Sequence, residues 1–278
     1  MLVPTAATAA LLQATQAAAV DAIQSDVLLS SSLWINIALA GFAALLFVYM
    51  GRNVTDSRAK FIFAATLMIP LVSISSYTGL LSGLTVGFIE MPAGHALAGE
   101  EVMSQWGRYL TWTLSTPMIL LALGLLAKVD TPDLFTVIAA DIGMCVTGLA
   151  AALVTSSYAL RWVFYLISCA FFVVVLYAVL VEWPDSAAAA GTDEIFGTLR
   201  ALTVVLWLGY PVIWALGVEG LALVQSVGIT SWGYSALDIG AKYVFAFLLL
   251  RWVAANEAVV AESGVTADPE AGAAAVDD

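Results

Sequence analysis

Residues 231–252 read SWGYSALDIGAKYVFAFLLLRW, an apolar stretch that nevertheless contains Asp238 and Lys242. About 20 helical residues cross a bilayer core of roughly 30 Å, so this stretch is long enough to span a membrane. Residues four apart in a helix share one face, separated by about 6 Å along the axis. Ionisable groups inside lipid are costly and usually functional, so the pair predicts a membrane helix built around a site.

The whole chain has the composition of a membrane protein. Of its 278 residues, 62% are hydrophobic and 11% are charged, whereas soluble domains average roughly 45–50% apolar and about 25% charged residues. The net charge is −12, with the acids concentrated in loops and tails. This acidic exterior argues against a nucleic-acid partner, which would need clustered Lys and Arg, and it suits a high-salt habitat where ions screen repulsion.

Apolar stretches of membrane-spanning length occur seven times. The connectors between them are polar or contain Gly and Pro, and they are too short to hold a second domain, so neighbouring helices should run antiparallel. The predicted fold class is an all-α membrane protein, a seven-transmembrane-helix bundle over residues 28–255. The expected spans are 28–50, 59–84, 105–127, 133–155, 160–182, 196–221 and 229–255.

The basic residues predict the orientation of the bundle. Only Arg161 falls on one side, so the positive-inside rule places the carboxyl terminus in the cytoplasm and the amino terminus outside. Residues 1–27 are expected to form an extracellular segment, whether disordered, a surface helix or a removed leader, and residues 256–278 a disordered acidic tail. The basic residues on the cytoplasmic side are Arg52, Arg58, Lys60, Lys128, Arg200 and Arg251.

Two basic residues that are not at span ends, Arg108 and Lys242, lie well inside apolar crossings, and the nearest acids that do the same are Asp141 and Asp238. A salt bridge that merely fixes packing is the simpler explanation of such groups. A buried lysine is, however, the usual site of a Schiff base with an aldehyde. An aromatic stripe is more often plain core than a ligand pocket, but beside the lysine it favours a pocket. The aromatic residues concerned are Trp112, Trp207, Tyr210 and Trp214.

Three stretches resemble the microbial (type 1) rhodopsins and, within them, the halorhodopsins: RYLTWTLSTPMILLALGLL (108–126), LWLGYPVIWALGVEG (206–220) and LDIGAK (237–242). The resemblance implies all-trans retinal bound to Lys242 as a protonated Schiff base, with Asp238 as counterion. It also implies that Asp141 pairs with Thr116 at the rim of the pocket, and that the protein is a homotrimer among membrane lipids. The implied retinal pocket consists of Trp112, Thr116, Asp141, Met144, Gly148, Ser168, Phe172, Trp207, Tyr210 and Trp214.

Relatives of this architecture that move protons carry acids at the positions of Thr111 and Ala122. A proton pump needs an acceptor and a donor that change protonation state, which neither residue can do. The resemblance therefore disfavours an outward proton pump. A photosensor coupled to a membrane transducer is a second alternative, but such sensors generally keep an acid at position 111, and no segment of the chain is dedicated to a partner.

Charge counting favours an anion as the transported ion. A protonated Schiff base and Arg108 give two positive charges against the single carboxylate of Asp238, and the surplus costs several kcal/mol in a low dielectric. Thr111 and Ser115 follow Arg108 at i+3 and i+7. Hydroxyl and guanidinium donors can replace the water shell of a halide, although a Ser or Thr in a membrane helix usually bonds its own backbone.

Together with the resemblance to halorhodopsins, these residues predict a light-driven inward chloride pump, a transporter rather than an enzyme, with no metal. Gln105 and Glu219 are candidates for the outer, anion-uptake side of the pathway, and Arg200 and Thr203 for the cytoplasmic, release side. For Arg200, a solvated residue obeying the positive-inside rule is an equally good explanation. His95, in the segment MPAGHALAGEE, is expected to be a solvated loop residue, although it could cap the loop or gather anions.

Overall fold

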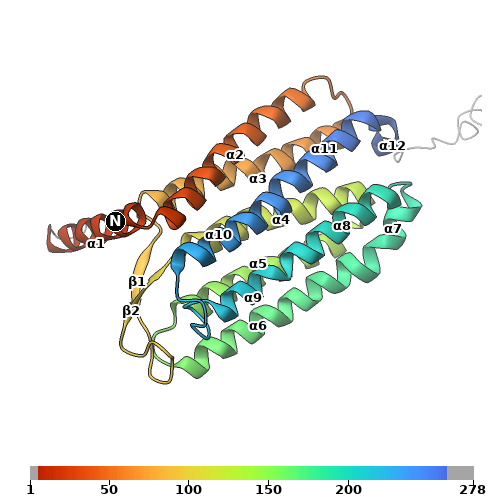
Figure 1. Cartoon of the computed structure of the whole chain (residues 1–278). Coiled ribbons are helices and arrows are strands. Elements are labelled where there is room, and N and C mark those ends of the chain that lie inside the picture. Colours follow the sequence, from red (N-terminus) through yellow and green to blue (C-terminus); the bar gives the residue numbers. More distant parts are fainter. Residues whose placement is uncertain (1–5, 262–278) are drawn as a thin grey trace, which may run out of the picture.

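The computed structural model describes residues 6–261, which form a bundle of long helices with a two-stranded sheet at one end (Figure 1). Two π-helical segments, Ala178–Glu182 and Ile239–Val244, interrupt the later helices. The helices and strands are α1 (Ala6–Ser25), α2 (Val27–Gly51), α3 (Ser57–Leu81), β1 (Gly87–Glu90), β2 (Glu101–Ser104), α4 (Gly107–Ala127), α5 (Thr131–Leu153), α6 (Tyr158–Tyr177), α7 (Trp183–Ala189), α8 (Asp193–Trp207), α9 (Gly209–Leu216), α10 (Val227–Asp238), α11 (Phe245–Ala255) and α12 (Glu257–Ala261).

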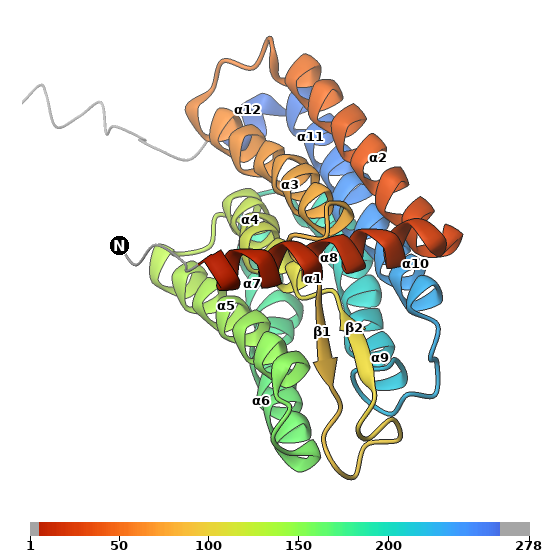
Figure 2. The same cartoon turned by 90° about the vertical axis from the view of Figure 1, so that its left-hand side faces the viewer.

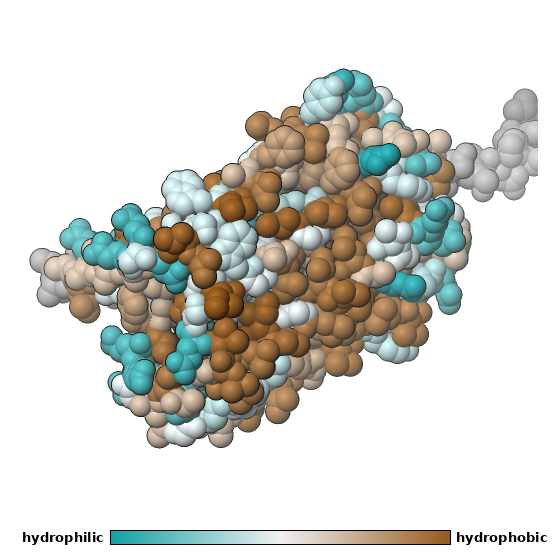
Figure 3. All heavy atoms as spheres, in the orientation of Figure 1, coloured by the Kyte–Doolittle hydropathy of each residue, from teal (hydrophilic) through white to brown (hydrophobic). Residues whose placement is uncertain are grey.

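These elements form seven helical segments long enough to span a membrane, as the sequence predicts. Six are long and apolar enough by composition alone within the described part of the chain. The seventh joins α10, the π-helical segment Ile239–Val244 and α11, and its buried charges make it less apolar than the others. The space-filling view shows what the bundle presents to lipid, with apolar residues over the middle and polar residues at both ends (Figure 3).

The ends of three spans differ from the prediction. The span expected at 59–84 ends at Leu81, because Gly83, with a φ of +71°, turns the chain toward β1. The span expected at 160–182 continues through a π-helical turn to Ala189. The span expected at 196–221 ends at Leu216 and is interrupted at Leu208. Pro211 explains the interruption, since it has no N–H for the carbonyl of Trp207.

A short hairpin between α3 and α4 closes one end of the bundle, called the outer end after the orientation that the sequence predicts. The sequence reasoning did not predict this hairpin. Strand β1 pairs antiparallel with β2, with Gly87 opposite Ser104 and Glu90 opposite Glu101. The loop between them holds His95, which is only 5% exposed. Its Nδ1 accepts a hydrogen bond from the backbone N–H of Leu97 at 3.0 Å. His95 is therefore a loop cap, and the expectation of a solvated histidine was wrong.

The two terminal segments are partly helical. Helix α1 lies across the outer end of the bundle (Figure 2), where Ala19 and Ile23 are buried, so the described part of residues 1–27 is a surface helix. At the other end, α12 packs against α3. Its Glu257 carboxylate accepts hydrogen bonds from the N–H and hydroxyl of Thr55 (2.7 and 2.9 Å) and from the Asp56 N–H. The rest of the expected tail, residues 262–278, lies outside the described residues.

Arg161 is an internal clamp rather than an ordinary loop cation. It lies in the first turn of α6 and is fully buried. Its Nη1 donates to the carbonyl oxygens of Ala152 (2.9 Å) and Val154 (2.8 Å) at the end of α5. Its Nε and Nη2 donate to the carbonyl oxygen of Glu219 (3.2 and 2.9 Å) in the loop after α9. One side chain therefore ties together three elements at the outer end of the bundle.

Replacing Arg161 by Met should destabilise the fold by about 3 kcal/mol or more, because hydrogen bonds from charged donors contribute roughly 1.5–3 kcal/mol and buried carbonyls would be left unpaired. The measurement is thermal unfolding of the detergent-solubilised protein followed by circular dichroism. The matched control is Arg251→Met, since Arg251 is exposed on α11. Equal losses in the two variants would contradict the role of Arg161 as a clamp.

Candidate functional site

The centre of the bundle holds a buried ion pair. Lys242 Nζ lies 3.1 Å from Asp238 Oδ2, and both residues are 1% exposed. The amine makes no hydrogen bond to another group in residues 6–261. Asp238 ends α10, and Lys242 lies in the π-helical segment that follows. Single π-helical turns inside α-helices are frequent at functional sites, and this one carries the amine.

Two tyrosines hold the carboxylate of Asp238 from opposite sides. The Tyr77 hydroxyl donates to Oδ2 at 2.6 Å, and the Tyr210 hydroxyl donates to Oδ1 at 2.6 Å. With Lys242 as a third partner, these bonds stabilise the charged form of the carboxylate in a dry interior. Sequence reasoning missed Tyr77, because nothing in the sequence of α3 links it to a residue 161 positions away.

Arg108, in the first turn of α4, is 3% exposed and is held only by neutral groups. Its Nε donates to Gln105 Oε1 (2.6 Å) and its Nη1 to the Tyr77 hydroxyl (3.2 Å). Its Nη2 donates to Ser231 Oγ at 2.6 Å. No carboxylate of the described chain lies within ion-pair distance of it. The guanidinium charge is therefore positioned but not neutralised.

The two hydroxyls expected beside Arg108 differ from each other. Both Thr111 (1% exposed) and Ser115 (0%) are buried. The Thr111 hydroxyl donates to the carbonyl oxygen of Gly107 at 3.0 Å, so its hydrogen is already used within α4. The expectation that Thr111 donates into the site therefore needs correction. The Ser115 hydroxyl has no hydrogen-bond partner among the residues the structure describes, and it remains able to donate.

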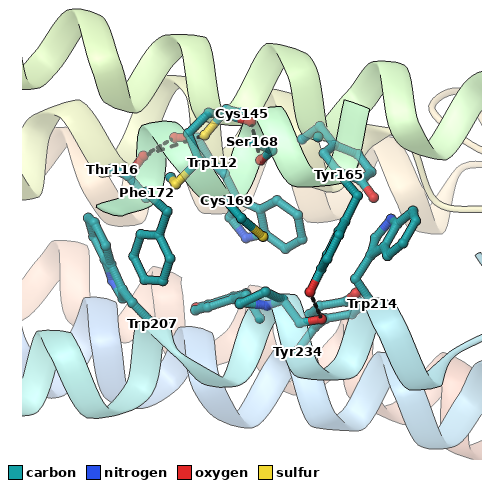
Figure 4. Close-up of a pocket in the computed structure, with 15 residues that line it drawn as sticks. Trp112, Thr116, Cys145, Tyr165, Ser168, Cys169, Phe172, Trp207, Trp214 and Tyr234 are labelled. Atoms are coloured by element: carbon teal, nitrogen blue, oxygen red, sulfur yellow. Dashed lines mark hydrogen bonds between the residues drawn. The ribbon is translucent and has the colours of Figure 1, made fainter. Parts of the chain in front are cut away.

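An apolar cavity lies between α4, α5, α6, α8, α9 and α10 (Figure 4). Of the residues expected to form a ligand pocket, all but Asp141 line it. Asp141 lies behind the wall, fully buried, and accepts a hydrogen bond from the Thr116 hydroxyl at 2.7 Å, which is the pairing expected for it. The sequence analysis did not assign the remaining lining residues, which are Tyr109, Cys145, Tyr165, Cys169, Pro211 and Tyr234.

The residues that line the cavity suit an apolar ligand. The cavity walls are mainly aromatic rings held edge to face or stacked, such as Trp112 against Tyr210 (centroids 5.3 Å apart) and Tyr165 on Trp214 (4.7 Å). Tyr210 joins the cavity to the ion pair, because its ring lines the cavity and its hydroxyl binds Asp238. An amine lacking a hydrogen bond is therefore close to one wall of an apolar pocket, where an aldehyde could condense with it.

A second, more polar hollow lies on the outer side of the cavity. Arg108, Gln105 and Glu219 all line it, so the structure brings the residues expected on the uptake side together. The Glu219 carboxylate accepts hydrogen bonds from Ser104 Oγ (3.1 Å) and the Tyr109 hydroxyl (2.8 Å). Burial raises the pKa of Glu219 above its usual value, while these hydrogen bonds and the charge of Arg161 oppose that shift.

The two residues expected on the release side lie on one face of α8. Arg200 is half-buried, and its Nη1 donates weakly to the carbonyl oxygen of Leu180 at 3.4 Å. Thr203 is 2% exposed, and its hydroxyl is unpartnered among residues 6–261. Trp207, four residues after Thr203, lines the cavity. This face of α8 therefore leads from the basic end of the bundle to the cavity.

Comparison with known proteins places this geometry in a family. Residues 27–256 match the family model described as bacteriorhodopsin-like protein. The chain is 70% identical to cruxhalorhodopsin-3 of Haloarcula vallismortis over 99% of its own length and 100% of that protein. It is 72% identical to a halorhodopsin of Halobacterium salinarum, covering 95% of each chain.

A solved structure gives the same result. It is described as halorhodopsin, a light-driven chloride pump, and superposes on this chain with a TM-score of 0.84 at 75% sequence identity. The match covers 85% of this chain and 99% of the solved one.

Proposed function

This chain belongs to the bacteriorhodopsin-like family and, within it, to the halorhodopsins, and on that premise we propose that it is a light-driven pump that moves chloride inward across the cell membrane. The observation that carries the proposal is the charge of Arg108. Among the described residues, this buried cation has neutral partners only, while Asp238 is shared with Lys242. One positive charge is left over in the membrane interior, and a mobile anion can balance it.

The chromophore that the family implies is retinal. We assign all-trans retinal to the aromatic cavity, with its covalent attachment, a protonated Schiff base, at Lys242 Nζ and Asp238 as counterion. When bound, retinal would supply the absorption of light and a light-driven change in the direction in which the N–H at Lys242 Nζ points. The protein's own part is to hold one charge at Lys242, to exclude water with aromatic walls and to fix Asp238 between Tyr77 and Tyr210.

We propose that the anion is held between Arg108, Ser115 and Thr111. Ser115 has a hydroxyl hydrogen free to donate, and Arg108 has N–H groups beyond those bonded to neutral acceptors. Thr111 contributes its methyl surface rather than its hydroxyl hydrogen, which is bonded to Gly107. Such a site binds a halide reversibly, because weak, replaceable donors let the ion leave when the charge that held it moves.

The route on either side follows the remaining polar groups. Gln105 and Glu219 line the outer hollow with Arg108 and would guide an anion toward the guanidinium. Thr203 and Arg200 lie along α8 toward the opposite end and would receive it on release. The basic end of the bundle faces the cytoplasm in this proposal, so the carboxyl terminus is inside and α1 is outside. As the sequence resemblance implied, we propose a homotrimer surrounded by lipid.

Two alternatives account for the site less well. An outward proton pump needs acids at positions 111 and 122, where this chain has Thr111 and Ala122, both fully buried. A photosensor coupled to a transducer shares the fold, but it gives no role to an unneutralised arginine. The relatives that cover nearly the whole chain are halorhodopsins, which favours the chloride pump over both.

Replacing Lys242 by Ala should abolish covalent attachment of added retinal, because no other buried amine adjoins the cavity in the described chain. The measurement is the visible absorption band together with the mass of the denatured, borohydride-reduced protein. Lys60→Ala, on the exposed start of α3, is the control and should attach retinal normally. A coloured, mass-shifted K242A variant would contradict the assignment.

Removing halide should change the visible absorption of the retinal-loaded protein, and chloride should restore it. Replacing Ser115 by Ala removes the free hydroxyl donor of the proposed anion site and should weaken chloride binding about tenfold, in line with roughly 1.5 kcal/mol for a hydrogen bond to a charged partner. Ser75→Ala on the exposed face of α3 is the control. A wild-type spectrum that stays constant from zero to molar chloride would exclude an anion at this site.

Illuminated cells that contain the protein should take up protons passively, because inward chloride makes the cell interior negative. The external pH should therefore rise, more so with a protonophore, and the signal should vanish when sulfate replaces chloride. Active proton export would instead acidify the medium, and a protonophore would abolish that change. This experiment separates the chloride pump from the proton pump directly.

A further inference from the structure

Arg108 is tethered to the first membrane helix through two serines that the function above does not use. Its Nη2 donates to Ser231 Oγ at 2.6 Å, and Ser231 Oγ lies 2.6 Å from Ser32 Oγ. The Ser32 hydroxyl donates to the carbonyl oxygen of Leu29 at 2.8 Å. Because the Ser32 hydrogen is used in this way, the hydrogen between the serines belongs to Ser231. The result is a directed chain from Arg108 through Ser231 and Ser32 to the backbone of α2.

Every link of this chain is buried and neutral. Ser32 is 0% exposed and Ser231 is 1% exposed, so water does not compete for their hydroxyls. The tyrosine rings on either side of the guanidinium, Tyr77 and Tyr234, each lie 5.4 Å from its carbon and carry no charge. Ser231 is therefore an acceptor that fixes the direction of Arg108 while leaving its full charge available.

The chemistry of position 231 thus decides how much of that charge an anion meets. A carboxylate there would approach Nη2 about as closely as the hydroxyl does now, and a charged pair at this distance in a dry interior is strongly favoured. It would supply from within the protein the negative charge that a halide otherwise provides. A neutral amide of the same size would keep the hydrogen bond without that effect.

We propose that Ser231 is a positioning residue that sets the anion affinity of the pump, by holding Arg108 through a neutral acceptor tied to Ser32. The inference rests on the proposed function, since it assumes that Arg108 attracts the transported halide. It adds a requirement for the first and seventh membrane helices: α2 and α10 must offer hydroxyls, not carboxylates, at this point.

The test compares Ser231→Asp with Ser231→Asn in the full-length, retinal-loaded protein, with chloride titrated into halide-free sulfate buffer. The two side chains have nearly the same size and differ in charge. S231D should raise the chloride dissociation constant at least tenfold, whereas S231N should stay within about threefold of wild type. Pigment yield and thermal midpoint of both variants show whether the fold is intact.

The outcomes separate this inference from the function on which it rests. A wild-type protein without any halide-dependent absorption would reject the anion site itself. Chloride binding in the wild type that S231D leaves unchanged, or that S231N weakens as much as S231D, would overturn the role of charge at position 231.

Should S231D form no pigment, Ser231→Ala and Ser231→Thr decide the matter. Thr keeps the hydroxyl acceptor and should bind chloride like wild type, while Ala loses it and should bind at least threefold more weakly. Equal affinity in the Ala variant and in wild type would then overturn the proposal.

Discussion

The structure is organised around a deficit of negative charge inside the membrane. Lys242 and Asp238 form a close ion pair. The Tyr77 hydroxyl is hydrogen bonded to both Asp238 and Arg108, and no carboxylate of the described chain forms an ion pair with Arg108. A buried charge needs an opposite charge or hydrogen bonds to replace its water shell. The guanidinium of Arg108 has hydrogen bonds but no opposite charge beside it. This single imbalance explains why a chain with this fold moves an anion, although neither Thr111 nor Ala122 can exchange a proton.

The surrounding polar groups position charge without cancelling it. Tyr77 illustrates the arrangement, since its hydroxyl donates to Asp238 and accepts from Arg108, linking anion and cation through a neutral group. Gln105 and Ser231 hold the other edges of the guanidinium. Neutral hydroxyls and amides orient a cation through directed hydrogen bonds but do not cancel its charge, so the charge remains available to an exchangeable halide.

The rest of the bundle separates the two media on either side of this centre. Aromatic side chains line the cavity, and Arg108 lines a more polar hollow on its outer side. Arg161 links the outer ends of α5 and α6 to the loop after α9, because its guanidinium donates hydrogen bonds to backbone carbonyl oxygens of both α5 and that loop. On the opposite side, Arg200 and Thr203 lie on one face of α8, where the Thr203 hydroxyl has no hydrogen-bond partner among residues 6–261. An anion that leaves the centre therefore meets different surroundings in each direction.

The sequence alone determined the membrane fold, the Lys242–Asp238 pair and most of the cavity wall, because these depend on hydropathy, on helical spacing and on motifs within single helices. It also located Arg108 and Ser115 on one helix. Only the tertiary structure decided which groups from distant helices meet: Tyr77 from α3 and Ser231 from α10 on Arg108, and Arg161 on the carbonyls of α5. It also showed that the hydroxyl of Thr111 is used by its own helix. The physical reason is that a hydrogen bond depends on distance and direction between atoms, and helix packing, not spacing along the chain, sets both.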